Sequence, residues 1–314
     1  MSTLYVGIDV SKDRLDIALR PSGETWSEGN GPDGISFLMG KLKALGPALV
    51  VLEATGGYQM PVTAALAAAG MPVVVVNPRQ VRDFARSLGL LAKTDALDAN
   101  VIARFAEMVK PEPRPLPDEA GRQLQDLLAR RRQLLGMLVA EKNHLVMVTD
   151  PSIRRDVKSH IEFLKKRLGK LDDDLGDKLR STPAWREKDE LFRSVPGVGR
   201  VLSVTLLAGL PELGRLNRKE IAALAGLAPF NRDSGSMKGQ RRVWGGRANV
   251  RQALYMSALV GTRYNPVIRA FYKRLTEKGK TPKVALTACM RKLLVILNTM
   301  AKTGTRWNPA MQEA

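Results

Sequence analysis

The first apolar runs of the chain alternate with short polar turns. Residues 4–12 (LYVGIDVSK) and 14–21 (RLDIALRP) are mostly apolar, and residues 24–29 (ETWSEG) form a weaker third run. Apolar runs of this length bounded by turn residues are typical of strands joined by hairpins. The pattern therefore predicts an antiparallel meander of three strands.

Helical and buried-strand patterns then follow each other. Helix-like spacing in 35–45 and 61–70 flanks two nearly continuous apolar runs, ALVVLEATG at 48–56 and MPVVVVNP at 71–78, and two further helices are expected through Val109. This order indicates a parallel strand pair covered by helices. A meander followed by right-handed crossovers is the order of the ribonuclease H-like fold, which we predict for residues 1–112.

A proline-rich segment separates this α/β domain from a charged helical region. Four prolines in KPEPRPLP, residues 110–117, exclude helix and strand. Residues 118–182 then predict two long amphipathic helices divided at Asp150 and Pro151, either folded on each other or paired with another copy. We interpret them as a coiled-coil oligomerisation region. Their apolar stripe consists of Leu124, Leu127, Leu128, Leu134, Leu135 and Leu138, then Ile161, Leu164, Leu168, Leu171 and Leu175.

Residues 183–314 predict a mainly helical C-terminal domain. SVPGVGRVLSVTLLAGL, residues 194–210, joins two helices through Gly197 and Gly199 in the manner of a helix-hairpin-helix element, whose backbone N–H groups can hold a DNA phosphate. A plain helix-helix turn would give the same pattern. The sequence lacks a Walker A motif and any strand before these glycines, which excludes a nucleotide cofactor.

The positive charge is concentrated in this last part. The net charge is +19 overall, yet residues 1–110 carry 11 basic and 11 acidic side chains, and residues 183–314 carry +16. Such a cluster is typical of a polyanion-binding face. A basic tail kept for solubility is the alternative, although the region is also rich in periodic apolar residues.

Several other chemistries are excluded by composition. His144 and His160 are the only histidines and both lie in the charged helical region, so neither a serine-histidine-aspartate triad nor a histidine-rich metal site is expected. Cys289 stands alone and is expected to be a small apolar helix residue. With neither a signal-like N-terminus nor a membrane-length apolar run, we expect a cytoplasmic protein without membrane partners.

Carboxylates interrupt apolar runs at two places that the predicted fold makes neighbours. Asp9 lies in the first strand and Glu53 ends the fourth. Asp95 and Asp98 share one face at the start of the last helix of the domain. Four such groups would hold two divalent ions, as in phosphodiester chemistry. Alternatively, Asp95 and Asp98 are ordinary first-turn residues favoured by the helix dipole, while Asp16 is expected to face solvent.

A second candidate lies in the loop LAPFNRDSGSMKGQRRVWGG, residues 227–246. Ser234 is surrounded there by Arg232, Lys238, Arg241 and Arg242, a setting that could hold a scissile phosphate. Lacking a histidine, the serine would have to pass its proton to a carboxylate or to metal-bound hydroxide. A serine in such a loop is also an ordinary turn residue, and by composition Ser236 is equally eligible.

Five motifs in order, GIDVSK, EATGGY, KTDALDA, VPGVG and GLAPFNRDSGS, make the chain resemble the insertion-sequence 110 transposases, the DEDD-type recombinases related to the Piv invertases. The resemblance implies a RuvC-like domain in which Asp9, Glu53, Asp95 and Asp98 bind Mg²⁺. It also implies a transposase domain in which Ser234 forms a covalent phosphoserine link to DNA.

Further partners are implied by the same resemblance. Family members look like tetramers that join a RuvC-like domain of one protomer to the serine of another, guided by a bridge RNA on donor and target DNA. A nucleoid-associated protein would follow. Trp244 stands where many relatives carry a lysine, and Arg247 could substitute for it. The expected nucleic-acid contacts are Gly197, Gly199, Arg232, Lys238, Arg241, Arg242, Arg247 and Arg251.

Two other functions remain open. A RuvC-like nuclease that cleaves branched DNA with metal-activated water would make Ser234 dispensable. A nucleic-acid-binding scaffold would need only the basic third of the chain, and the carboxylates would then have no catalytic role.

Overall fold

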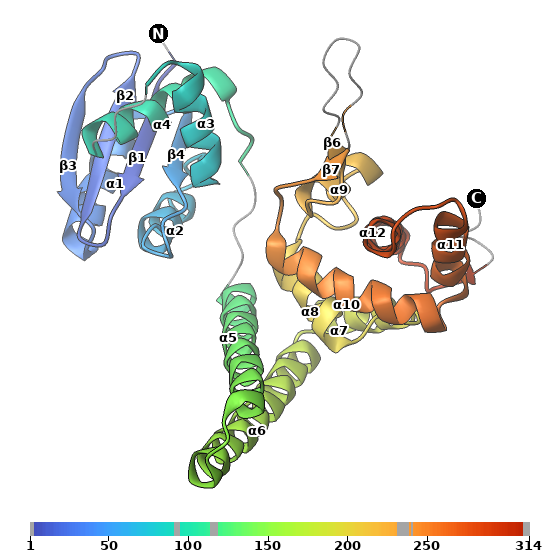
Figure 1. The fold of residues 1–314 in the computed structure, drawn as a ribbon. Coiled ribbons are helices and arrows are strands. Elements are labelled where there is room, and N and C mark those ends of the chain that lie inside the picture. Colours follow the sequence, from blue (N-terminus) through green and yellow to red (C-terminus); the bar gives the residue numbers. More distant parts are fainter. Residues whose placement is uncertain (1–2, 91–94, 114–118, 231–238, 240, 310–314) are drawn as a thin grey trace. The chain divides into compact units, whose positions relative to one another are not determined.

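The computed structural model describes residues 3–90, 95–113, 119–230, 239 and 241–309, and of residues 95–97 only the backbone. The chain forms two compact units, Met1–Leu116 and Pro117–Ala314. Figure 1 shows the sheet in the first unit and the helices of the second. The charged helical region at 118–182 falls within the second of these units.

The first unit is built on a mixed sheet. Its described strands lie in the order β3 (Thr25–Gly29), β2 (Arg14–Arg20), β1 (Tyr5–Val10), β4 (Leu49–Glu53) and β5 (Val73–Val76). The first three are antiparallel, whereas β4 and β5 run parallel to β1. This is the predicted meander followed by parallel strands, so the ribonuclease H-like α/β prediction is confirmed.

Helices cover both faces of the sheet. Alternate residues of the strands point to opposite faces. Val6, Ile8 and their neighbours pack against α1 (Pro32–Leu45) and α2 (Met60–Ala68). The other face, which includes Tyr5 and Val51, packs against α3 (Pro78–Ser87) and α4 (Asp95–Val109). Burial on both faces explains why these strands are nearly continuous apolar runs.

The second unit begins with the long helices α5 (Glu119–Met147) and α6 (Pro151–Ser181). Asp150 caps α6, accepting hydrogen bonds from the N–H groups of Ser152 and Ile153 at 2.9 and 3.0 Å. Pro151 occupies the first turn of the helix, where no N–H is needed. The two helices therefore fold back on each other, as one of the two predicted arrangements required. Their shared stripe of buried residues consists of Leu134, Leu138, Val157, Ile161, Leu164 and Leu168.

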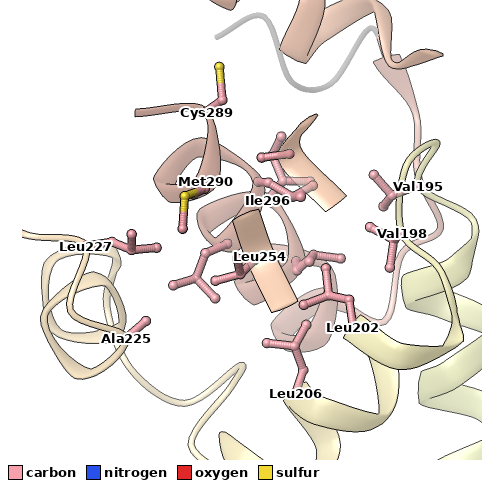
Figure 2. Packing of buried hydrophobic residues seen from close by; sticks show 14 of the residues in the cluster. Val195, Val198, Leu202, Leu206, Ala225, Leu227, Leu254, Cys289, Met290 and Ile296 are labelled. Carbon is pink, nitrogen blue, oxygen red and sulfur yellow. The ribbon is translucent and has the colours of Figure 1, made fainter. Parts of the chain in front are cut away.

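The remaining elements form a helical bundle around a separate core. They are α7 (Pro183–Arg193), α8 (Arg200–Gly209), α9 (Arg218–Leu224), the short strands β6 (Pro229–Phe230) and β7 (Arg242–Val243), α10 (Ala248–Tyr264), α11 (Pro266–Glu277) and α12 (Pro282–Thr303). Figure 2 shows side chains from α8, α10 and α12 meeting in this core. The C-terminal part is mainly helical, as predicted.

The long helical hairpin and α12 both pack into the second unit. The base of the α5/α6 hairpin packs on α8 through Leu124, Leu175 and Val204. Among the described residues α12 is the one helix long and apolar enough to cross a membrane, but 56% of its most apolar window is buried inside the unit. It packs as the central core helix, with Leu294 and Leu297 fully buried.

Candidate active site

Asp9 and Glu53 lie at the same edge of the sheet. Ile8 of β1 is paired with Leu52 of the parallel strand β4, so the next residue on each strand is Asp9 and Glu53. Both share a face with Gly7 and Val51, the face covered by α4, and both are half-buried. The adjacency predicted from the fold is therefore present in the backbone.

Helix α4 lies against β1 and runs in the opposite direction. A Cβ added at Gly7 would be 2.2 Å from the Ala103 amide nitrogen and 2.5 Å from the Ala99 carbonyl oxygen. Past the C-terminal end of α4, the Lys110 ammonium lies 5.8 Å from the ring centroid of Tyr5, at the start of β1. The N-terminal turn of α4 therefore lies toward the Asp9 end of the strand.

The start of α4 and Asp9 of β1 lie at a similar distance from the contact between Gly7 and Ala99. From Gly7 to Asp9 the strand advances about 6.6 Å, and from Ala99 back to Asp95 the helix advances about 6 Å. Asp95 begins α4 and Asp98 is half-buried one turn further on. The side chain of Asp95 lies outside the described residues.

The donor chemistry of this edge fits a hard divalent cation, since Asp9, Glu53 and Asp98 offer carboxylate oxygens. Among the side chains that the structure describes, however, no three histidine, cysteine or acidic groups lie close enough to hold a metal ion. The convergence is thus one of backbone positions, and the four-carboxylate Mg²⁺ site stays a prediction.

Asp16 does not face solvent as expected. It is directly opposite Asp9 in the β1/β2 ladder and only 8% exposed. Its carboxylate accepts hydrogen bonds from Ser27 Oγ at 2.5 Å and from Arg14 Nε at 2.9 Å. The signal was present in RLDIALR, where apolar residues on both sides of the aspartate indicate a strand buried on both faces.

The loop with Ser234 connects β6 and β7. Ser234, Ser236, Arg232 and Lys238 lie outside the described residues. The paired strands at the base of the loop are described, with Phe230 opposite Arg242. Arg241 and Arg242 are exposed there, as a contact with a phosphate would require.

Arg247 and Arg251 are engaged inside the unit. Arg247 makes a bidentate pair with Glu212, with both N–O distances 2.6 Å, and donates to the Gly209 carbonyl at 2.9 Å. Arg251 donates to the Gly245 carbonyl at 2.6 Å. Trp244, by contrast, is 58% exposed. The sequence offered no signal for the side-chain partners of Arg247, because Glu212 and Gly209 lie far away along the chain.

The two glycines of the predicted helix-hairpin-helix turn differ. Gly197 has a positive φ of 94°, and a Cβ there would lie 3.0 Å from the Gly261 backbone, so close packing on α10 requires this glycine. Gly199 is the N-cap of α8 and has open space around it. Gly199 thus leaves room for a ligand, whereas Gly197 is explained by packing.

Two family models match this chain. Residues 6–150 match the DEDD-type transposase model of IS110, described as a transposase, and residues 189–273 match the Transposase IS116/IS110/IS902 family. The chain is 29% identical over 325 residues to the pilin gene-inverting protein of Moraxella bovis, with the full length of both covered.

Proteins of insertion elements match a smaller part. The chain is 32% identical over 161 residues to the insertion element IS900 uncharacterized 42 kDa protein of Mycobacterium paratuberculosis, which covers 48% of this chain and 39% of that protein. Among solved structures, the Thermus thermophilus RuvC structure is matched at 18% identity with a TM-score of 0.26, covering 36% of this chain and all of the other. The assignment of the fold rests on the strand order and not on this weak overlap.

Proposed function

We propose, because the chain belongs to the IS110 family of transposases, that it cuts and rejoins DNA through a covalent link to Ser234, assisted by carboxylates that bind Mg²⁺. The observation that carries the proposal is the convergence of Asp9, Glu53 and the start of α4 at one edge of a ribonuclease H-like sheet. The full-length similarity to an invertase supports strand exchange rather than simple hydrolysis.

The acidic residues and the serine would divide the chemistry. Asp9, Glu53, Asp95 and Asp98 would hold one or two Mg²⁺ ions, which supply positive charge to the oxygens of the scissile phosphate. The Ser234 hydroxyl attacks phosphorus, so that an Oγ–P bond forms and a P–O bond to one deoxyribose breaks. The serine proton passes to a carboxylate, and the released DNA oxygen takes up a proton. Attack by a DNA hydroxyl on the phosphoserine then reverses these steps and rejoins the strands.

The basic side chains of the second unit would bind the DNA backbone. Phosphate contacts supply most of the affinity and its salt dependence, without reading sequence. Exposed cations follow α10, α11 and the start of α12, with one acidic residue, Glu277, among them. They are Arg263, Arg269, Lys273, Arg274, Lys278, Lys280 and Lys283.

A guide RNA and a tetramer complete the proposal. The described residues contain no recognisable base-reading element, which suits a protein whose target is chosen by base pairing. The α5/α6 hairpin exposes Val146 and Met147 at its tip, 84% and 82% exposed, as a contact surface for a second copy. Sequencing the RNA that copurifies with the protein, and measuring the mass of the assembly in solution, test these two parts separately.

Covalent trapping on a nicked suicide substrate tests the central step. We expect the wild type and Ser236→Ala to form a protein–DNA adduct with Mg²⁺, and Ser234→Ala to form none. Asp9→Asn should also lose the adduct but keep DNA affinity within about twofold, because the basic face dominates binding.

Two results would contradict the proposal. If Ser234→Ala cleaves at the wild-type rate without an adduct, the protein is a nuclease that uses activated water. If Asp9→Asn retains every activity of the wild type, the protein is a binding scaffold.

A further inference from the structure

The two ends of the β6/β7 hairpin meet in a close backbone contact. Gly226 precedes β6, and Gly245 and Gly246 follow β7. A Cβ at Gly226 would lie 2.1 Å from the Gly245 carbonyl oxygen, and one at Gly246 would lie 2.1 Å from the Gly226 nitrogen. All three have a positive φ, between 65° and 71°. Neither Gly226 nor Gly246 could carry a side chain in this contact, so the entry and the exit of the hairpin lie directly against each other.

Arg247 fastens the exit of the hairpin to the helices beneath it. Its backbone N–H donates to the Leu224 carbonyl, at the end of α9, at 2.9 Å. Its guanidinium holds Glu212 through both terminal nitrogens and also reaches the Gly209 carbonyl, at the end of α8. The pair is largely buried, with 29% of the arginine and 17% of the glutamate side chain exposed. A bidentate, charge-assisted pair of this kind fixes direction as well as distance.

Arg251 adds a second tie one helical turn later. Its Nη1 donates to the Gly245 carbonyl at 2.6 Å and reaches the Ala225 carbonyl at 3.4 Å. These carbonyls belong to the two ends of the hairpin. Arg247, the N-cap of α10, thus holds the exit, and Arg251 in the first turn of that helix holds both ends.

We propose that Arg247, Glu212 and Arg251 form a clamp that positions the β6/β7 hairpin, and are positioning residues rather than direct nucleic-acid contacts. The catalytic consequence rests on the proposed function, since the segment between the strands includes Ser234. A nucleophile must be held close to its productive geometry, and an error of about 1 Å can cost about 100-fold in rate. The clamp would restrain the two strands at which the segment with Ser234 begins and ends.

The charge around Arg247 favours this role over phosphate binding. Glu212 already occupies both terminal nitrogens of the guanidinium and would repel an incoming phosphate. Under positioning, removing either partner should have the same effect. Under phosphate binding, losing Glu212 should strengthen DNA binding and losing Arg247 should weaken it.

The test compares Glu212→Gln, Arg247→Ala and Arg247→Lys in the full chain. We expect the first two to slow single-turnover adduct formation at least tenfold with DNA affinity unchanged within about twofold. Arg247→Lys should recover part of the rate, because an ammonium contacts the carboxylate without the fork geometry. Arg131→Lys is the matched control, since Arg131 also makes a bidentate pair, with Asp172 at 2.6 and 3.2 Å, remote in sequence from the hairpin. It should leave the adduct rate unchanged.

Hydrogen exchange separates the clamp from the chemistry. In Glu212→Gln, amides of 226–230 and 241–247 should exchange at least tenfold faster, while those of α12 stay protected and show that the unit is folded. This readout does not depend on Ser234. Unchanged exchange of these hairpin amides would overturn the clamp. So would weaker DNA binding by Arg247→Ala combined with stronger DNA binding by Glu212→Gln. If exchange becomes faster but the rate of adduct formation does not change, the clamp has no catalytic role. If Ser234 turns out not to form an adduct, the exchange measurement still tests the clamp.

Discussion

Replacing Gly7 by alanine is the most direct perturbation of the acidic edge. The added Cβ would meet the backbone of α4 at 2.2, 2.5 and 2.8 Å. Real Cβ contacts begin above 3 Å, and backbone cannot rotate away as a side chain can. Helix α4 must therefore retreat from β1 by about 1 Å or the sheet must deform, which in packed interiors costs about 1–3 kcal/mol.

Hydrogen exchange of the full chain measures this cost. We expect amides of β1 and β4 in Gly7→Ala to exchange about 5- to 150-fold faster, the range that corresponds to 1–3 kcal/mol. Mg²⁺-dependent adduct formation should fall as well, since α4 carries Asp95 and Asp98.

Gly40→Ala is the matched control in the same unit. A Cβ there meets nothing within 4 Å, and Gly40 lies inside α1. Alanine should stabilise that helix by about 0.5–1 kcal/mol. If Gly7→Ala behaves like Gly40→Ala, α4 does not lie flat on β1, and the argument that places its acidic residues beside Asp9 is wrong.

Three further outcomes follow from local contacts. Leu124→Ala, at a fully buried position packed against α8, should lower the free energy of unfolding in urea by about 2–5 kcal/mol. Leu135→Ala, on the exposed side of the same helix, should lower it far less. Equal losses of unfolding free energy would contradict the packing. Hydrogen bonds from the Ile153 and Ser152 N–H groups lower the pKa of Asp150, so the start of α6 should lose exchange protection as the pH falls through that lowered pKa. Asp150→Asn, which caps without titrating, should show no such change. Burial raises the pKa of the Cys289 thiol to about 11, so iodoacetamide at pH 8 should label this cysteine only after unfolding. Fast labelling of the native chain would contradict the burial of Cys289 in the core.

The sequence was sufficient for the order of the strands. Continuous apolar runs and the polar turns between them predicted the meander, the parallel pair and the break after it. Asp9 and Glu53 could be paired because parallel strands end at one edge of a sheet. The break at Asp150 and Pro151 likewise predicted the point at which the long helices turn.

Contacts between distant segments could not be predicted in the same way. Arg247 is one of fifteen basic residues between 232 and 292, and nothing in its neighbourhood along the chain indicates that Glu212 neutralises it. The role of Gly7 depends on a helix about 95 residues later. For Asp16, burial was readable from the pattern, but its partner Ser27 required the register of β2 against β3.

The paired helices α5 and α6 have a mechanical consequence. Helix α5 has 29 residues and at 1.5 Å per residue is about 44 Å long, stiffened midway by the Arg131–Asp172 pair and seated on α8 at its base. It therefore acts as a lever rather than a tether. A partner that binds the far end would rotate the whole helical bundle with it. Under such a rotation, each residue moves by a distance that grows with its separation from the binding point.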